Sequence, residues 1–190
     1  MDDETFWNLI EDCRRRTPDP DERVAWLSGQ LARGAELEIV RFQICLDRVL
    51  TPTFTWELWA AADRIMGWCS DDSFFYFQLW LVGLGRDAFE RVARDPDALA
   101  ELPEVVRLVG REREAWDEEE WLVWEELDYA ALRAFTQVTG RSEGDFFDAV
   151  EAQRGDGSGP LDPAGERWDA RDDTEAERRL PRLRALFPVS

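Results

Sequence analysis

The sequence contains no histidine and no lysine, so all 23 of its basic residues are arginine. Without histidine, the chain cannot use Ser-His-Asp or Cys-His catalysis, and it cannot hold a metal ion through imidazole. Without lysine, it cannot form a Schiff base or use the lysine of a phosphate-binding loop. Any general acid–base chemistry would therefore fall to Asp, Glu, Tyr or Cys.

Cysteine is also scarce, since Cys13, Cys45 and Cys69 are odd in number and lie far apart. A disulfide framework and a zinc site of the Cys-x-x-Cys kind are therefore not expected. Cys13 and Cys45 fall on apolar helix faces, where we expect them to act as small core residues. The pattern indicates no cofactor and no metal.

Long hydrophobic runs are missing as well. The longest, residues 74–84, is interrupted by Gln78 and Gly83, and it falls short of the roughly 18 residues that span a bilayer. The chain starts with the acidic residues 2–4, whereas a secretory signal starts with basic ones. We therefore expect a soluble protein in the cytoplasm.

Acidic residues are in large excess, because 42 Asp and Glu face 23 Arg and give a formal net charge of −19. A nucleic-acid binder needs clustered positive charge to displace counterions, so we expect no binding to DNA or RNA. The same sign disfavours an anionic membrane, whereas a basic protein or a cation would be attracted. The partner is then an unknown protein or a small-molecule ligand, and nothing in the sequence indicates an oligomeric state.

Apolar residues recur at spacings of three and four along most of the chain, and no segment alternates as a half-buried strand does. We predict an all-α fold, a single compact multi-helix domain with a buried central helix pair at residues 39–50 and 74–81. Residues 1–153 form the predicted helical domain. Residues 154–165 form a flexible loop, and residues 166–190 form a C-terminal segment that docks back on the domain.

Several residues mark where helices begin or end. Thr55 and Ser142 are expected to cap the helices that follow them. Gly67 and Gly140 fit the left-handed position that ends many helices. Between residues 112 and 138, the apolar spacing predicts one long helix or a helix pair.

Five stretches together carry a resemblance to a known family: residues 5–10, 58–62, 67–81, 95–99 and 180–183. On these stretches the chain resembles the bacterial family called domain of unknown function 4240, over about residues 6–187. The motif Cys-Ser-Asp-Asp-x-Phe-x-x-Phe at residues 69–77 is the most specific part. The sequence departs from the family pattern at Trp68 and Gln78, where the resemblance implies Gly and Arg. The resemblance implies a shared helical fold and supplies no activity.

The sharpest candidate site is the short connection between the helices predicted at residues 55–66 and 72–82. A short connection favours an antiparallel pair, whose shared end would hold the predicted ligand-binding residues Trp68, Cys69, Ser70, Asp71, Asp72 and Tyr76. The two carboxylates would bind a cation or a polar group, and Trp68 or Tyr76 would cover the apolar part of the ligand. The helix N-terminus beside Cys69 would also lower the pKa of its thiol. The alternative is structural: Ser70 or Asp71 simply caps the second helix.

Two further features suggest a binding surface. Ten tryptophans should mostly lie in the core, yet such an excess also suits an amphipathic cleft for a cationic or ring-bearing ligand. Residues 112–128 hold nine acids with Trp116, Trp121 and Trp124 interleaved. This segment is either a solvated helix face or a docking surface for a basic protein.

These features predict a binding or interaction protein of unknown partner, without an indicated enzymatic activity. One alternative is a carboxylate-based hydrolase or lyase, with or without a divalent metal. The other is an immunity-type inhibitor that masks a basic protein. Carboxylates converging in a pocket would favour the enzyme, whereas an acidic surface with an exposed tryptophan would favour the inhibitor.

Overall fold

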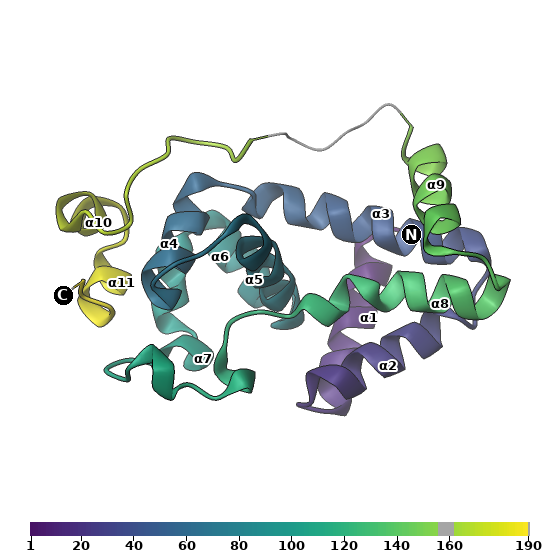
Figure 1. Ribbon diagram of the computed structural model, residues 1–190, viewed down its shortest axis with the longest axis horizontal. Helices are drawn as coiled ribbons and strands as arrows, with labels where there is room; N and C mark the ends of the chain where they lie inside the picture. The colour runs from purple at the N-terminus through teal and green to yellow at the C-terminus, as the bar shows by residue number, and fades with distance from the viewer. Residues whose placement is uncertain (156–161, 190) are drawn as a thin grey trace. The chain divides into compact units, whose positions relative to one another are not determined.

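The computed structural model describes residues 1–155 and 162–189. Within these ranges the regular structure is helical, which confirms the predicted all-α fold (Figure 1). An isolated bridge pairs Thr55 with Ala164 outside any strand. No helix in the described ranges is long and apolar enough to cross a membrane. The chain divides into two compact units.

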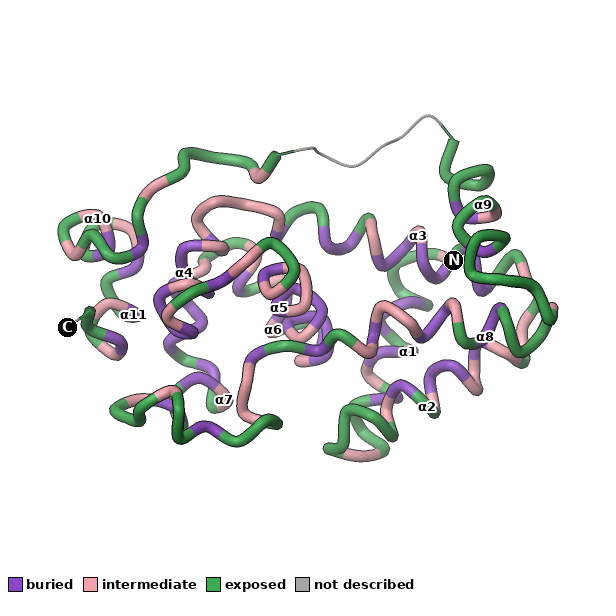
Figure 2. The backbone as a smooth tube through the Cα atoms, in the orientation of Figure 1, coloured by how far each residue is buried: buried purple, intermediate pink, exposed green. Residues whose placement is uncertain are grey.

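Unit 1 comprises residues 1–51, 82–85 and 124–155. Its elements are α1 (Asp3–Arg16), α2 (Pro20–Leu31), α3 (Glu36–Leu50), the 3₁₀ turn η5 (Glu125–Leu127), α8 (Tyr129–Thr139) and α9 (Glu143–Arg154). Helix α3 is central, because it packs on α1, α8 and α9. Its side chains Ile39, Phe42 and Leu46 are fully buried. Figure 2 shows how buried and exposed residues alternate along these helices, as expected of amphipathic helices around a core.

Local signals set several helix ends in unit 1. The Ser142 hydroxyl accepts a hydrogen bond from the Asp145 amide and caps α9, as predicted. Gly140 ends α8 in the left-handed conformation, with φ of +68°. Cys13 and Cys45 are buried, which confirms them as core residues.

Unit 2 comprises residues 52–81, 86–123 and 162–189. Its α-helices are α4 (Trp56–Met66), α5 (Asp71–Gly83, with its last two residues in unit 1), α6 (Arg86–Arg94), α7 (Pro103–Val106), α10 (Asp173–Arg179) and α11 (Pro181–Leu186). Its 3₁₀ turns are η1 (Thr51–Thr53, whose first residue belongs to unit 1), η2 (Pro96–Glu101), η3 (Arg113–Ala115) and η4 (Glu118–Glu120). The turn η2 contacts α4, α6, α7 and α11, so it lies at the centre of this unit.

A stack of aromatic rings joins α4 to α5. The ring centroids of Trp56 and Trp59 are 5.3 Å apart, and those of Trp59 and Phe74 are 4.6 Å apart. Phe74 continues the stack to Phe77 at 6.3 Å. Such pairs add roughly 0.5–1.5 kcal/mol each beyond the area that they bury. The stack therefore packs the first turn of α4 against the start of α5, where the candidate site lies.

The predicted long helix or helix pair at residues 112–138 is wrong for residues 112–128 and is confirmed for residues 129–138, which lie in α8. Residues 113–127 form three separate 3₁₀ turns with extended residues between them, and α8 begins only at Tyr129. In a continuous helix, four pairs of acids would lie one turn apart, and each such pair is destabilising: Glu114–Asp117, Glu114–Glu118, Asp117–Glu120 and Glu125–Asp128. The extended backbone of Trp116 also lets its ring reach the core, where its exposed fraction is 7%.

The two segments of the predicted central pair belong to different units. Residues 39–50 lie in unit 1, and residues 74–81 lie in unit 2. Each segment is largely buried, and their pairing remains a prediction. Half of the predicted loop at residues 154–165, namely residues 156–161, lies outside the described residues.

Candidate functional site

The connection between α4 and α5 begins with a helix end of the predicted kind. Gly67 adopts φ of +85° and donates its N–H to the carbonyl of Asp63 at 2.7 Å. A side chain at this position would be strained by the positive φ, and its Cβ would also lie 2.9 Å from the guanidinium of Arg113. That guanidinium donates to the carbonyl of Ile65 at 2.9 Å. Gly67 therefore permits a tight turn sealed by an arginine from a distant part of the chain.

Cys69 is a buried structural residue. Its carbonyl accepts the indole N–H of Trp59 at 2.9 Å, and its amide N–H donates to the carboxylate of Asp63. Burial, followed by the nearby charge of Asp63, raises the pKa of the Cys69 thiol to about 12. The expectation of a lowered thiol pKa is wrong, because burial outweighs the helix N-terminus. The thiol is protonated at neutral pH and is a poor nucleophile.

Ser70 is the cap of α5. Its hydroxyl accepts the amide N–H of Ser73 at 3.1 Å, and its carbonyl accepts that of Phe74 at 2.8 Å. Asp71 and Asp72 occupy the first helical turn and are exposed. Acids at this place complement the helix dipole. Among the described residues, no group of three or more Cys, Asp and Glu is placed to hold a metal ion.

Trp68 is the exposed member of the predicted site. All ten tryptophans lie within the described residues, and Trp68 alone is exposed, with an exposed fraction of 68%. Tyr76 is half-buried, and its ring lies 5.9 Å from that of Phe75. The six predicted residues are thus close in the chain but differ in environment. Cys69 and Ser70 form hydrogen bonds that fix the backbone between α4 and α5, whereas Trp68, Asp71 and Asp72 face solvent.

Charged side chains of both signs lie around the turn that precedes Trp68. Burial raises the pKa of Asp63, the field of Asp169 raises it further, and the fields of Arg171 and Arg113 oppose this. These four charges therefore lie near the turn. Both arginines are already engaged with main-chain carbonyls, since Arg171 donates to that of Gly67 at 3.2 Å and Arg113 to that of Ile65.

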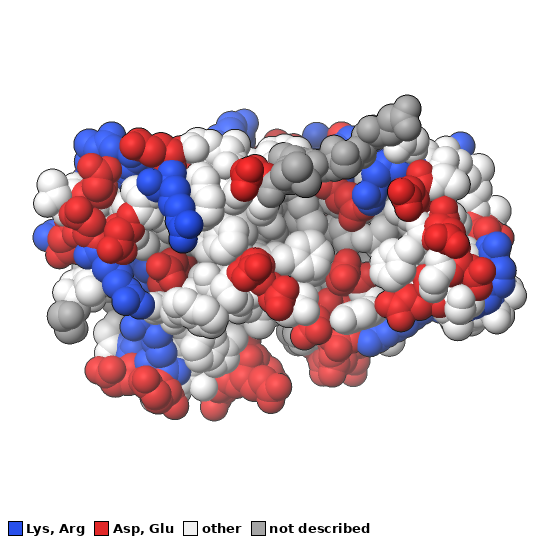
Figure 3. Space-filling view, turned by 45° about the horizontal axis from the view of Figure 1, so that its top comes forward, with Lys and Arg blue, Asp and Glu red and all other residues white. Residues whose placement is uncertain are grey.

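Glu112 and Glu114 are exposed, and they flank Arg113, whose guanidinium lies against Gly67, the residue before Trp68. We define the Trp68 surface as Trp68, Asp71, Asp72, Glu112 and Glu114. It combines one large exposed ring with four exposed carboxylates. Figure 3 shows that acids also gather in patches, with arginines among them, on the face that it draws.

Sequence reasoning missed the arginines that organise unit 2. Arg64 lies on the apolar side of α4, next to Ala61 and Ile65, and its side chain is 0% exposed. A charge within an apolar helix face was the available signal. Arg113 and Arg171 carried no local signal, because they bond carbonyls 48 and 104 positions away.

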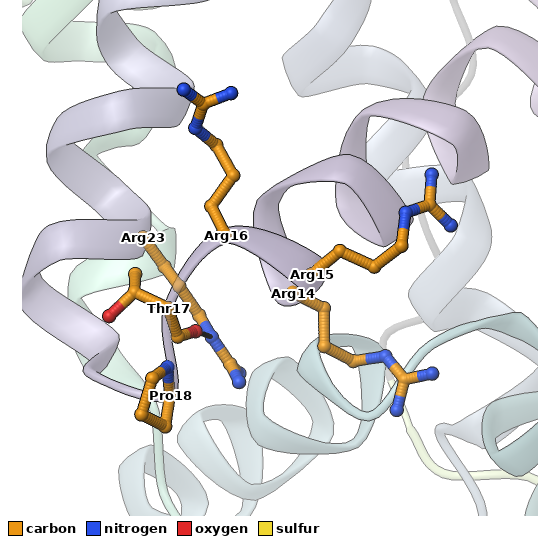
Figure 4. A pocket seen from close by; sticks show the side chains of 6 residues that line it. All are labelled: Arg14, Arg15, Arg16, Thr17, Pro18 and Arg23. Atoms are coloured by element: carbon orange, nitrogen blue, oxygen red, sulfur yellow. Dashed lines mark hydrogen bonds between the residues drawn. The ribbon is translucent and has the colours of Figure 1, made fainter.

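Unit 1 has a shallow depression of about 350 Å³ lined by Arg14, Arg15, Arg16, Thr17, Pro18 and Arg23. Figure 4 shows the guanidinium groups of Arg14, Arg15 and Arg16 pointing in different directions. Arg14 pairs with Glu11 and Arg15 with Asp12. The four arginines therefore do not converge on a single anion. Arg14, Arg15 and Arg16 lie in the last turn of α1, where cations complement the helix dipole.

Fold and site together define an acidic helical protein that presents one exposed tryptophan among carboxylates. The family model described as "Protein of unknown function (DUF4240)" matches residues 1–137, and the chain belongs to this family. This confirms the resemblance seen in the sequence, although residues 138–187 lie outside the match. No curated protein and no solved structure matches the chain.

Proposed function

We propose that this chain is a binding protein that takes a basic segment of a partner protein on the Trp68 surface. The observation that carries the proposal is the 68% exposure of Trp68, in a chain whose other nine tryptophans are buried or half-buried. An exposed indole is costly to solvate, and tryptophan is enriched, with tyrosine and arginine, among the residues that contribute most of the binding energy of an interface. Truncating such a residue typically costs about 2 kcal/mol or more of binding energy.

The backbone around Trp68 supports an anchor that is ordered before binding. The preceding residue, Gly67, is bonded to Asp63 and Arg171. The following residue, Cys69, is bonded to Trp59 and Asp63. A preorganised side chain loses less entropy on binding than a mobile one.

Charge supports a basic partner over an apolar or acidic one. Asp71, Asp72, Glu112 and Glu114 are exposed, and the formal net charge of −19 attracts cations over long range. An arginine or lysine of the partner would lie over the indole face and gain about 0.5–2 kcal/mol from the cation–π contact. The carboxylates would mainly accelerate association with the partner and fix the position of its basic segment on the Trp68 surface.

This proposal joins the two binding hypotheses of the sequence, since masking a basic protein is one form of such binding. No observation on the described residues favours the hydrolase or lyase. The three cysteines are unpaired, which supports a reducing compartment, so we place the binding in the cytoplasm.

A peptide-display selection against the parent chain tests the proposal. We expect selected peptides to carry net positive charge, and we expect their Kd to rise about 30-fold with Trp68→Ala. Phe147→Ala is the matched control, because Phe147 is another exposed aromatic residue, 54% exposed, and it lies on α9 in unit 1. Replacing Glu112 and Glu114 by Gln should slow association several-fold and reduce its salt dependence.

Selected peptides that are neutral or acidic would contradict the proposal. So would peptides whose Kd is unchanged by Trp68→Ala, or changed equally by Phe147→Ala. Circular dichroism of both variants checks that neither substitution alters the fold. We expect no such change, because both rings are more than half exposed.

A further inference from the structure

Two buried charges of unit 2 lie outside the Trp68 surface. The Arg64 side chain on α4 is 0% exposed, and the Asp97 side chain on η2 is 4% exposed. Removing a charge from water is costly unless hydrogen bonds replace its hydration. The hydrogen bonds of both side chains go to residues 170–187.

Asp97 binds the beginning of α11. Its carboxylate accepts the amide N–H of Arg182 at 3.0 Å and that of Leu183 at 2.9 Å. The first amides of a helix have no partner within the helix, so a carboxylate is their natural acceptor. The Arg182 guanidinium adds a third bond to Asp97 at 3.0 Å.

Arg64 binds the end of the same helix. It donates to the carbonyl of Phe187, the residue that closes α11, at 3.0 Å. Its remaining nitrogens donate to the carbonyl of Ala170 at 2.7 Å and to the carboxylate of Asp173 at 2.6 Å. An anion at the N-terminus and a cation at the C-terminus both match the helix dipole. Helix α11 is therefore held at both ends through its main chain.

The side chains of this segment add apolar and basic contacts. Leu180 and Leu183 are fully buried, and Phe187 is 7% exposed. Helix α11 packs on η2 and α4. Arg182 also pairs with Asp95 and Glu101 at the rim. The bound segment is thus a short basic helix with leucines three residues apart.

We propose that Arg64 and Asp97 form a charge clamp for a short, basic, leucine-rich helix of a partner protein, with α11 occupying this clamp in cis. The clamp bonds main-chain groups that every helix offers, so a helix from another chain can satisfy it. The leucine contacts and the acidic rim supply the selectivity. Residues 64 and 97 fall within the family match at residues 1–137, whereas α11 lies beyond it.

Because α11 is part of the same chain, its effective concentration at the clamp is on the order of millimolar or higher. A partner helix must displace it, and weakening the cis helix should raise the affinity for the partner. Leu183→Ala removes a buried contact of α11 while leaving Arg64 and Asp97 intact. This site does not depend on the Trp68 surface, and either proposal can fail without the other.

The probe is a fluorescent synthetic peptide with the sequence of residues 178–188, measured by polarisation against the full chain at physiological salt. We expect weak binding to the parent and binding at least about 30-fold tighter to the Leu183→Ala chain. Adding Arg64→Met or Asp97→Ala to that chain should weaken binding at least about tenfold. Trp68→Ala should leave it unchanged.

A scrambled peptide of the same composition separates the clamp from simple charge attraction, and it remains decisive if a clamp variant fails to fold. We expect no saturable binding of the scrambled peptide. Equal binding of both peptides, or no binding to the Leu183→Ala chain, would overturn the proposal. If the parent chain sediments as a dimer whose two copies exchange α11, the occupant of the clamp is a second copy of this chain. That result would overturn the assignment to a partner protein.

Discussion

The ion pairs of unit 1 and unit 2 differ in where they lie. In unit 1, the long-range pairs Arg48–Asp3, Arg141–Glu36 and Arg154–Asp47 are all at least one third exposed on both sides. In unit 2, Arg64 and Asp97 are almost wholly buried and bond main-chain groups of Ala170 and of the two ends of α11 as well as side chains. Exposed pairs typically add 0–1 kcal/mol, whereas removing one member of a buried network costs several kcal/mol.

This difference shows how an acidic protein can hold a charged segment in a defined place. Unit 1 is organised by apolar packing around α3, and its charges contribute mainly to the surface. In unit 2, buried charged side chains form hydrogen bonds with the C-terminal segment and hold it in a defined position. The largest expected consequences of this contrast concern the buried groups of unit 2.

The largest effect concerns thiol reactivity. Burial raises the pKa of Cys69 from 9.0 to about 12, so the folded chain holds about a thousandfold less thiolate there than an unfolded chain. In unit 1, Arg48 donates to the Cys45 sulfur at 3.3 Å and partly offsets the rise in pKa caused by burial. We expect iodoacetamide to modify Cys45 before Cys69, as read by peptide mass spectrometry. Faster modification of Cys69 would contradict the account.

The raised pKa of Cys69 also makes the stability of the folded chain depend on pH. The folded thiol of Cys69 stays protonated up to about pH 12, whereas the unfolded thiol ionises near pH 9. Ionisation therefore favours the unfolded chain above pH 9. The contribution of Cys69 to stability should be full below pH 9 and should fall as the pH rises towards 12. Urea unfolding of the parent and of Cys69→Ala, which should differ less as the pH rises through this window, checks the sign.

The next effect compares a buried arginine with an exposed one. Arg64→Met keeps the side-chain volume but removes three hydrogen bonds from a charged donor, each worth about 1.5–3 kcal/mol. We expect a loss of at least about 3 kcal/mol in the free energy of unfolding. Arg141→Met, which breaks the exposed pair with Glu36, should cost less than about 1 kcal/mol. Similar losses in urea unfolding would show that burial does not distinguish the two pairs.

The smallest effect separates the cap of α5 from its neighbours. Ser70→Ala removes the acceptor for the Ser73 amide and should cost about 1 kcal/mol. Asp71→Ala and Asp72→Ala lose only the interaction with the helix dipole, about 0.3–1 kcal/mol each. If either aspartate costs more than Ser70 in urea unfolding, the carboxylate caps the helix and is not free to bind a partner.

Local chemistry explains which parts of the fold could be predicted. Thr55, Gly67 and Ser142 act on amides and carbonyls within four residues, so their roles were visible in the sequence. Residues 112–128 were predicted as helix because apolar spacing alone ignores repulsion between successive acids. The backbone conformation of this segment depends instead on repulsion between its acids and on burial of its tryptophans.

The candidate site was only partly predictable for a related reason. The motif at residues 69–77 correctly marked a helix start with a serine cap. The helix end before Trp68 and the burial of Arg64 involve contacts with residues more than 40 positions away. No sequence window of helical length contains both partners, so the sequence alone could not distinguish a buried arginine from a solvated one.

The central claim is that buried charges hold the C-terminal helix of unit 2 through its main chain, and hydrogen–deuterium exchange tests it most directly. Asp97→Ala removes the acceptor for the Arg182 and Leu183 amides. We predict that exchange in α11 rises at least about tenfold while that of α3, in unit 1, stays unchanged. Unchanged exchange in α11, or an equal rise in α3, would contradict the claim.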